Sequence, residues 1–456
     1  MKKKAKTAFF CTHCGHSHSR WQGQCDSCFE RNCLVEELIP SKESNLSKMG
    51  IDTERKPLKI SEINPQDAKR LSVGIKEVDT VLGGGLVPGS LVLLGGEPGI
   101  GKSTLLLQVC KALCDQGKKI LYLAGEESES QVKLRAQRLG LDSGEFYIFS
   151  EIQIQNIFSQ CEVLKPDLMV VDSIQTMKSN ELDSSPGSVS QVRECTLHFM
   201  EYCKLKNVAC LLVGHVTKGG EIAGPRLLEH MVDVVLQFEG DKNNWFRMLR
   251  GIKNRFGATD EIGIFEMKES GLQAVENAGL AFMNSDHFSS GSCQSVLLEG
   301  NQPFLVEVQA LVADNHFTYP KRTAMGLDLN RLQILLAVME KRLGVRVGEY
   351  DVFVNITGGV KTKDTGLDLA VVAAILSSLK DYVLDQDLLV IGEVGLGGEV
   401  RMTSRMESRV RESLKQGYKK FHLPWRAKNL GLEEFAESEV EMSYLKEIRK
   451  IQDLFR

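Results

Sequence analysis

The stretch Leu93–Val109, LLGGEPGIGKSTLLLQV, decides the fold, because it contains the pattern GxxxxGK[ST]. An aliphatic run, LVLL, leads into the loop, and a helical pattern, STLLLQVCKALC, follows it. In such a loop the backbone N–H groups and the helix N-terminus favour anionic phosphate, the lysine reaches the β- and γ-oxygens, and the serine hydroxyl can bind Mg²⁺. We therefore predict a P-loop that binds ATP and Mg²⁺. The predicted nucleotide-binding residues are Gly96, Glu97, Pro98, Gly99, Ile100, Gly101, Lys102, Ser103 and Thr104.

Acidic residues at the ends of two other predicted strands are candidates for the rest of this site. Asp172 follows four apolar residues in LMVVDS, where a metal-side carboxylate is expected, although a plain strand-end aspartate has the same pattern. Because Ser173 and not a glutamate follows it, the carboxylate that polarises the attacking water must come from another strand. Glu126 and Glu127 in LYLAGEES are the candidates, and the sequence does not choose between them. Two adjacent acids could equally be a solvated cap.

The composition changes along the chain and suggests four segments. Residues 1–35 are rich in Cys and His, and residues 36–70 are polar and charged, which is typical of a linker. From 71 to 275, short aliphatic runs alternate with longer helical patterns, which indicates βαβ units and a parallel sheet buried on both faces. Residues 276–456 form a separate α/β domain, with strands predicted in PFLVEVQALV, VFVNIT and LLVIGEVGL and helices in NRLQILLAVMEKRL and LDLAVVAAILSSL.

Length and composition are those of a globular protein with several domains. The chain has 456 residues, of which 42% are hydrophobic and 25% charged. A net charge of −4 excludes a uniformly basic DNA-coating protein but allows a local positive channel. No signal-peptide pattern and no run of about 18 apolar residues is visible, so we expect a cytoplasmic protein without a membrane partner. The cysteines among apolar neighbours are expected to be buried packing: Cys110, Cys114, Cys161, Cys195, Cys203, Cys210 and Cys293.

The N-terminal cysteines have the spacing of a metal site. Cys11 and Cys14 form one CxxC pair, Cys25 and Cys28 form another, and ten residues separate the pairs. Four thiolates suit tetrahedral Zn²⁺ and leave no open coordination position, so we predict a structural zinc site. A segment this short cannot fold on apolar burial alone, whereas structural zinc supplies on the order of 10 to 16 kcal/mol. The alternatives are free thiols without metal, or a ligand from the nearby histidines His13, His16 and His18.

Longer segments resemble known families. GIKEVDTVLGGGLVPGSLVLLGGEPGIGKST is similar to the segment leading into the P-loop of RecA-like ATPases. LLVGHVTKGGEIAGPRLLEHMVDVVLQFEG, the KNRFG motif at residues 253–257 and CTHCGHSHSRWQGQCDSC resemble the RadA (Sms) family of bacterial DNA repair proteins. The resemblance implies a RecA-like ATPase core with an N-terminal zinc finger, assembled as a homohexameric ring with ATP between subunits. It also implies a DNA-dependent, helicase-like motor on single-stranded DNA that processes or branch-migrates recombination intermediates with RecA.

The same resemblance suggests roles for several residues. His215 ends a strand where RecA-like proteins carry a γ-phosphate sensor, although it could be an ordinary hydrogen-bonded histidine. Lys218 and Arg226 lie in the segment that matches the family's central-channel loop and could hold a DNA backbone. MKSNELDSSPGSVSQVRE would be the companion loop, or a plain connection. Lys253 and Arg255 could act as fingers on a neighbour's nucleotide, or could contact DNA.

The C-terminal segment VNITGGVKTKDTGLDLAVVAAILSSL is similar to the active-site region of Lon-type proteases. In that comparison the nucleophilic serine falls on Gly366 and the lysine base falls near Glu407, so neither member of a Ser–Lys dyad is present. We therefore expect a proteolytically inactive scaffold. An ATP-dependent protease and a nucleotide-switched signalling ATPase are the competing functions. Four arginines are candidates for a DNA surface or a solvated helix face: Arg401, Arg405, Arg409 and Arg411.

Overall fold

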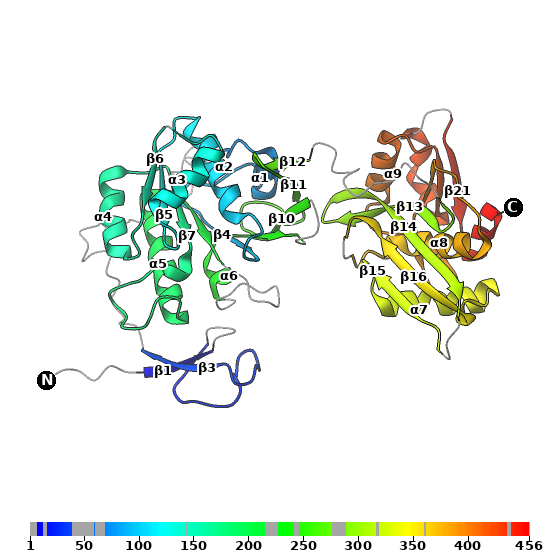
Figure 1. The fold of residues 1–456 in the computed structure, drawn as a ribbon, viewed down its shortest axis with the longest axis horizontal. Coiled ribbons are helices and arrows are strands. Elements are labelled where there is room, and N and C mark those ends of the chain that lie inside the picture. Colours follow the sequence, from blue (N-terminus) through cyan, green and yellow to red (C-terminus); the bar gives the residue numbers. More distant parts are fainter. Residues whose placement is uncertain are drawn as a thin grey trace. The chain divides into compact units, whose positions relative to one another are not determined.

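The computed structural model describes residues 7–11, 16–38, 59, 69–142, 144–214, 227–240, 246–275, 289–315, 319–359, 362–435 and 439–455. The chain divides into two compact units, Met1–Ala274 and Val275–Arg456 (Figure 1). Within the described ranges, no helix is long and apolar enough to cross a membrane.

The first unit contains a nine-stranded sheet in the order β12-β11-β10-β9-β4-β8-β7-β5-β6. The strands from β9 to β6 in this order are parallel, and β10, β11 and β12 extend the sheet by antiparallel pairing. The predicted parallel sheet is therefore confirmed. The strands are β4 (Leu91–Gly96), β5 (Ile120–Ala124), β6 (Phe146–Phe149), β7 (Leu168–Asp172), β8 (Ala209–Val213), β9 (Val234–Glu239), β10 (Phe246–Asn254), β11 (Ile262–Lys268) and β12 (Gly271–Ala274).

Helices cover both faces of this sheet. Along β4, Val92 and Leu94 pack into one apolar cluster, and Leu91 and Leu93 pack into another on the opposite face. The first cluster includes side chains of α1, α2 and α3, and the second those of α4, α5 and α6. Since both faces are covered, the strands read as continuous apolar runs. The helices are α1 (Lys76–Leu82), α2 (Lys102–Cys114), α3 (Glu129–Arg138), α4 (Ile154–Leu164), α5 (Val189–Lys206) and α6 (Leu227–Met231).

The N-terminal module is a small antiparallel sheet. Its order is β2-β1-β3, with β1 at Thr7–Cys11, β2 at Ser17–His18 and β3 at Leu34–Leu38. Cysteine side chains, and not a large apolar cluster, lie at its centre. His18 Nε2 lies 3.4 Å from Cys25 Sγ. The module therefore depends on its cysteines for a core, as its short length predicts.

The second unit is also α/β. Its seven-stranded mixed sheet has the order β15-β16-β14-β13-β17-β20-β21. Helix α8 (Asp368–Lys380) is buried along most of its length, and α7 (Leu329–Val338) packs into the same apolar cluster, whereas α9 (Met406–Lys415) contributes to a second cluster. The strands are β13 (Ser292–Glu299), β14 (Gln302–Asp314), β15 (Arg322–Met325), β16 (Tyr350–Ile356), β17 (Leu388–Val390), β20 (Lys420–Pro424) and β21 (Glu441–Leu445).

One predicted strand of this unit is wrong as a single element. The run LLVIGEVGL is divided into β17 and β18 (Glu393–Val394), and β18 pairs with β19 (Val400–Arg401) in a separate two-stranded sheet. The division falls at Gly392, whose N–H donates to Gly366 O at 2.9 Å and whose carbonyl accepts from Leu369 N at 3.0 Å. The chain leaves the sheet there because its backbone hydrogen bonds go to the segment around the start of α8.

Candidate functional site: a nucleotide cleft at the carboxyl ends of the parallel strands

The P-loop connects β4 to α2. Gly96 and Gly101 both have positive φ, 155° and 118°, and a Cβ atom would lie 2.7 Å from Phe238 O at the first position and 2.7 Å from Met267 Cε at the second. Only glycine fits both positions without displacement. Helix α2 begins at Lys102 and has no side-chain cap, so its first N–H groups are directed at the loop. This is the arrangement that binds phosphate at a helix N-terminus.

Lys102 is buried under the loop. Its Nζ donates to Gly96 O at 2.7 Å and to Glu97 O at 3.0 Å. Burial lowers the pKa of Lys102, and the negative charges of Asp172 and Glu126 oppose that shift. The ammonium group is therefore held by the carbonyl oxygens of its own loop and is also stabilised by the charges of the two predicted acidic residues.

The carboxyl ends of β4, β5 and β7 meet at this edge, and they enclose a cleft of about 440 Å³. Asp172 ends β7, and its Oδ2 accepts a 2.6 Å hydrogen bond from the hydroxyl of Tyr122. Burial and this carboxylate raise the pKa of Tyr122, so the hydroxyl remains a donor. The cleft is lined by Pro98, Gly99, Gly101, Lys102, Ser103, Thr104, Tyr122, Ala124, Glu126, Glu127, Val132, Arg135, Asp172, Val213 and Met267.

The two adjacent glutamates have different partners. Glu126 accepts a hydrogen bond from the hydroxyl of Ser173, the residue after Asp172. Glu127 pairs with Arg135 of α3. Because Ser173 is fully buried, its hydrogen bond fixes the carboxylate of Glu126 on the same side of the cleft as Asp172. The contacts therefore distinguish the two residues, which the sequence did not.

The KNRFG motif at the end of β10 makes contacts within its own chain. Lys253 Nζ donates to the carbonyl oxygens of Glu229 at 2.6 Å and Val232 at 2.7 Å, at the end of α6. Burial is the main cause that lowers its pKa. Arg255 Nη1 lies 3.2 Å from Asp233 Oδ1, and its side chain is 52% exposed. Lys253 thus holds the end of α6, whereas Arg255 reaches the surface beside an acidic residue.

Several predicted residues lie outside the described residues: Cys14, His215, Lys218 and Arg226. The predicted companion loop is described, and it is an ordered connection into α5. Gln191, fully buried, accepts from Ser179 N at 2.9 Å and donates to the carbonyl oxygens of Leu182 and Ser184, each at 3.0 Å. One amide side chain therefore holds several turns of this loop against the start of the helix.

The N-terminal cysteines come together as a metal site requires. The sulfur atoms of Cys11, Cys25 and Cys28 all lie within 4.8 Å of one another, and those of Cys11 and Cys28 are 3.6 Å apart. Ligands in a tetrahedral zinc–thiolate site with bonds of about 2.3 Å would be about 3.8 Å apart, so this donor set fits Zn²⁺. Cys33, which the sequence analysis did not assign, has its Sγ only 3.3 Å from Cys11 Sγ. Its position five residues after the second pair is the signal that could have identified it.

The predicted packing cysteines are buried, and this prediction is confirmed. Burial raises the pKa of the thiols of Cys114, to about 11, and of Cys161 and Cys195, each to about 12. Such thiols remain protonated and apolar at neutral pH.

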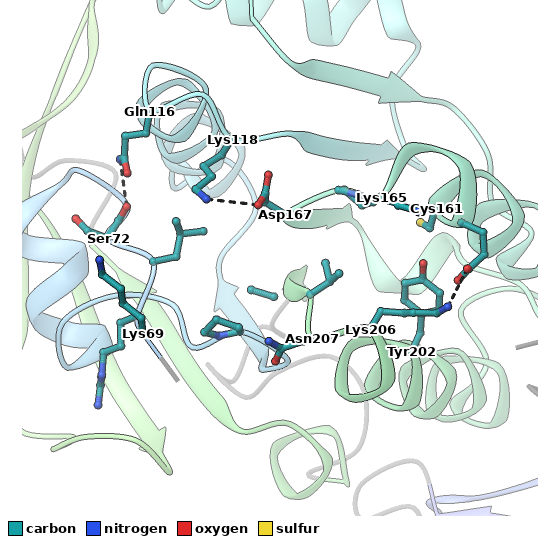
Figure 2. Close-up of a pocket in the computed structure, with 17 residues that line it drawn as sticks. Lys69, Ser72, Gln116, Lys118, Cys161, Lys165, Asp167, Tyr202, Lys206 and Asn207 are labelled. Carbon is teal, nitrogen blue, oxygen red and sulfur yellow. Dashed lines mark hydrogen bonds and ion pairs between the residues drawn. The ribbon is translucent and has the colours of Figure 1, made fainter. Parts of the chain in front are cut away.

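A larger cavity, of about 810 Å³, lies at the opposite edge of the sheet, beside the amino ends of β5, β7 and β8 (Figure 2). Figure 2 shows Lys118 next to Asp167. Lys118 Nζ lies 3.5 Å from Asp167 Oδ1, and Lys206 Nζ lies 2.8 Å from Glu162 Oε2. This cavity is separate from the nucleotide cleft, because the P-loop lies at the opposite edge of the sheet, at the carboxyl ends of the strands. The sequence carried no signal for it, since its lining comes from several distant segments such as the one around Lys69.

An ion pair fills the space beside Gly366, the position that aligns with the nucleophile of Lon-type proteases. A Cβ atom on Gly366 would lie 2.8 Å from Arg409 Nη1 and 3.0 Å from Asp364 Oδ1. Arg409 is fully buried, and its guanidinium donates to both oxygens of Asp364 at 2.7 and 3.0 Å and to Val296 O at 2.6 Å. The suggestion that Arg409 lies on a DNA surface or a solvated helix face is therefore wrong. Glu407, near the aligned lysine position, pairs on the surface with Arg411 at 2.8 Å.

Known proteins resemble the chain over nearly its whole length. The AAA domain family matches residues 55–221, and the family of subunit ChlI of Mg-chelatase matches residues 331–427. DNA repair protein RadA of Bacillus subtilis (strain 168) is 46% identical over 425 residues, which cover 92% of this chain and 93% of that protein. DNA repair protein RadA of Halalkalibacterium halodurans is 46% identical over 434 residues, 94% of each chain. A solved KaiC-like protein from Pyrococcus horikoshii OT3 covers 46% of this chain and 99% of its own, at 19% identity and a TM-score of 0.37, too low to add to the assignment.

Proposed function

Because the chain belongs to the family of DNA repair protein RadA, we propose that this RecA-like ATPase is a DNA-dependent motor. It moves along single-stranded DNA and processes or branch-migrates recombination intermediates together with RecA. The observation that carries the proposal is the nucleotide cleft, where Lys102, Asp172 and Glu126 lie together at the carboxyl ends of parallel strands. A site of this kind binds and hydrolyses a nucleoside triphosphate, and hydrolysis can drive movement.

Each residue of the cleft has a proposed role. The loop N–H groups and Lys102 bind the phosphates of ATP, and Ser103 and Asp172 hold Mg²⁺, which neutralises charge on those phosphates. Glu126 is the residue that accepts the proton of the attacking water, because its carboxylate is fixed beside Asp172 by the hydroxyl of Ser173. Glu127 supports this position indirectly, since its pair with Arg135 ties the strand end to α3.

We propose that KNRFG acts on the nucleotide of a neighbouring subunit in a homohexameric ring. Arg255 is half exposed and supplies the positive charge that stabilises the transition state. Lys253 holds the end of α6, the helix that directly follows the predicted channel segment with Lys218 and Arg226. The motif would in this way connect the DNA-holding segment to the neighbour's ATP.

The other modules have supporting roles in this proposal. The cysteine module binds structural Zn²⁺ through Cys11, Cys14, Cys25 and Cys28, because the described members of this set have the right separation. The second unit is an inactive scaffold for the ring, because Arg409 occupies the space that a side chain at position 366 would need. The proposal places the protein in the cytoplasm, where bacterial DNA lies.

Steady-state ATPase activity tests the proposal. We expect single-stranded DNA to stimulate hydrolysis, higher salt to weaken the stimulation because it competes at the phosphate backbone, and Lys102→Ala to abolish activity. Turnover that is indifferent to DNA at low and at high salt would remove the motor and leave a signalling ATPase. Branch extension in a RecA-initiated strand-exchange reaction then tests the finer claim, with Lys102→Ala as the control that must fail to extend.

A further inference from the structure

A buried cluster of possible metal ligands lies where the companion loop meets α5, away from both sites described above. It consists of Glu181 in the loop and Glu194 and His198 on the helix. His198 is 3% exposed, and the side chains of Glu181 and Glu194 are 17% and 14% exposed. Glu194 and His198 are four residues apart on one helix, so they face the same direction.

The imidazole of His198 is buried, and within the residues that the structure describes neither ring nitrogen, Nδ1 or Nε2, makes a hydrogen bond of good geometry. Leaving a buried polar group unsatisfied costs free energy, so such a group calls for an explanation. Nε2 is directed at the two carboxylates, 3.5 Å from Glu194 Oε1 and 3.9 Å from Glu181 Oε2.

The charge around the imidazole is negative. Within the described part of the chain, neither Glu181 nor Glu194 pairs with a lysine or an arginine. The carboxylates of Glu181, Glu194 and Glu201 all act on the imidazole of His198. These carboxylates lie in a partly dry environment, where uncompensated like charges are costly. A cation of higher charge would compensate them.

The separations fit the coordination sphere of a small divalent ion. Ligands about 2.1 Å from a metal are about 3.4 Å apart in a tetrahedron, close to the 3.5 and 3.9 Å measured from His198 Nε2. All three donor atoms lie within 4.8 Å of one another, so a small inward movement brings them into contact with one ion. One imidazole and two carboxylates form a nitrogen and oxygen donor set, which suits Mn²⁺, Fe²⁺ or Zn²⁺.

We propose that Glu181, Glu194 and His198 bind one divalent first-row metal ion, which fastens the companion loop to α5. The loop is held on one side by Gln191 through Ser179, Leu182 and Ser184. The ion would hold the same loop about one to two helical turns further along α5, through Glu181. Since two of the three ligands lie on α5 and the third lies in the loop, the ion would fix the separation of the loop from the helix at this point.

Uptake of Mn²⁺ by the full, zinc-loaded chain without nucleotide tests the proposal, with electron paramagnetic resonance to count free Mn²⁺. Mn²⁺ prefers oxygen and nitrogen donors to thiolates, so the cysteine module does not compete for it. We expect one bound ion per chain, and at least about a tenfold loss of affinity in Glu194→Gln and in His198→Gln. Asp172→Asn identifies any uptake that belongs to the nucleotide cleft.

Glu201→Gln is the matched control, because it removes a carboxylate that acts on His198 from the same helix but is not among the three ligands. The proposal requires this variant to bind Mn²⁺ as the parent does. An equal loss of Mn²⁺ affinity in Glu201→Gln would show that charge alone attracts the ion, and it would overturn the proposal. A parent chain that binds no more Mn²⁺ than the double variant Glu181→Gln/Glu194→Gln would also overturn the proposal. A second readout is trypsin cleavage after Lys178, which Mn²⁺ should slow in the parent and in Glu201→Gln but not in His198→Gln.

Discussion

The adjacent glutamates of the nucleotide cleft allow a paired test of the catalytic assignment. Glu126→Gln removes the charge of a carboxylate fixed by Ser173, whereas Glu127→Gln removes the charge of one paired with Arg135. Loss of a general base lowers kcat by about 10²- to 10⁴-fold, which corresponds to about 3 to 5 kcal/mol of transition-state stabilisation. The pair of Glu127 is partly solvated, with side chains 25% and 35% exposed, so its loss costs at most about 1 kcal/mol of stability.

The assay is steady-state ATPase with saturating single-stranded DNA, combined with the dissociation constant of a fluorescent ATP analogue. We expect Glu126→Gln to lose kcat at nearly unchanged nucleotide affinity, because the residue acts on water and not on the phosphates. We expect Glu127→Gln to keep kcat within a few-fold of the parent. Equal losses in both variants, or a larger loss in Glu127→Gln, would refute the argument from contacts. A fall in nucleotide affinity in Glu126→Gln would instead assign that residue to binding.

Three further predictions concern residues that the structure places within the two units. Arg409→Met should destabilise the second unit by about 3 to 5 kcal/mol in urea unfolding, because the carboxylate of Asp364, only 11% exposed, loses its cationic partner and keeps only backbone N–H donors, whereas exposed Arg411→Met should change little. Burial lowers the pKa of His422, so below pH 6.5 the unfolded chain binds a proton that the folded chain does not. The free energy of unfolding should therefore fall as the pH drops below 6.5. His422→Leu should reduce the dependence of the free energy of unfolding on pH by up to about 1.4 kcal/mol per pH unit. Lys253→Met should abolish DNA stimulation of the ATPase without weakening nucleotide affinity, and a loss of affinity would contradict its assignment to the end of α6.

The part of the fold around the P-loop could be predicted from the sequence for a physical reason. In a parallel sheet the carboxyl ends of strands lie at one edge, so residues such as Asp172 and Glu126, which end apolar runs, must be near the phosphate loop. The position of each strand end is visible in the sequence, whereas the partner of each side chain is not. The choice between Glu126 and Glu127 depended on Ser173 and Arg135, which lie 47 residues after one and 8 residues after the other.

The burial of Arg409 shows a different limit. Arginine is read as a surface residue, and the pattern of several arginines in this region favours an exposed face. Yet Met406, Val410 and Ser413 are also buried, and their spacing places position 409 on the inner face of α9. The helical periodicity therefore predicts a buried residue at position 409, whereas the residue type alone predicts an exposed one. What the sequence could not show is the carboxylate acceptor, Asp364, which makes a buried arginine tolerable at that position.

The cluster of Glu181, Glu194 and His198 could not be predicted for both of these reasons: residue spacing alone is ambiguous, and the partner of each side chain is not visible in the sequence. Glu194 and His198 are four residues apart, a spacing that is visible in the sequence but common among solvated helical pairs. Two facts give the pair a chemical meaning: the buried ring of His198 makes no well-formed hydrogen bond in the described part of the chain, and Glu181 is brought beside it from the preceding loop. The position of Glu181 follows from the hydrogen bonds of Gln191 to the loop backbone, and no periodic pattern encodes such contacts. A ligand set that one loop residue completes can therefore be found only after the position of the loop is known. Replacement of that loop residue, Glu181, most directly tests whether an ion holds the loop against α5.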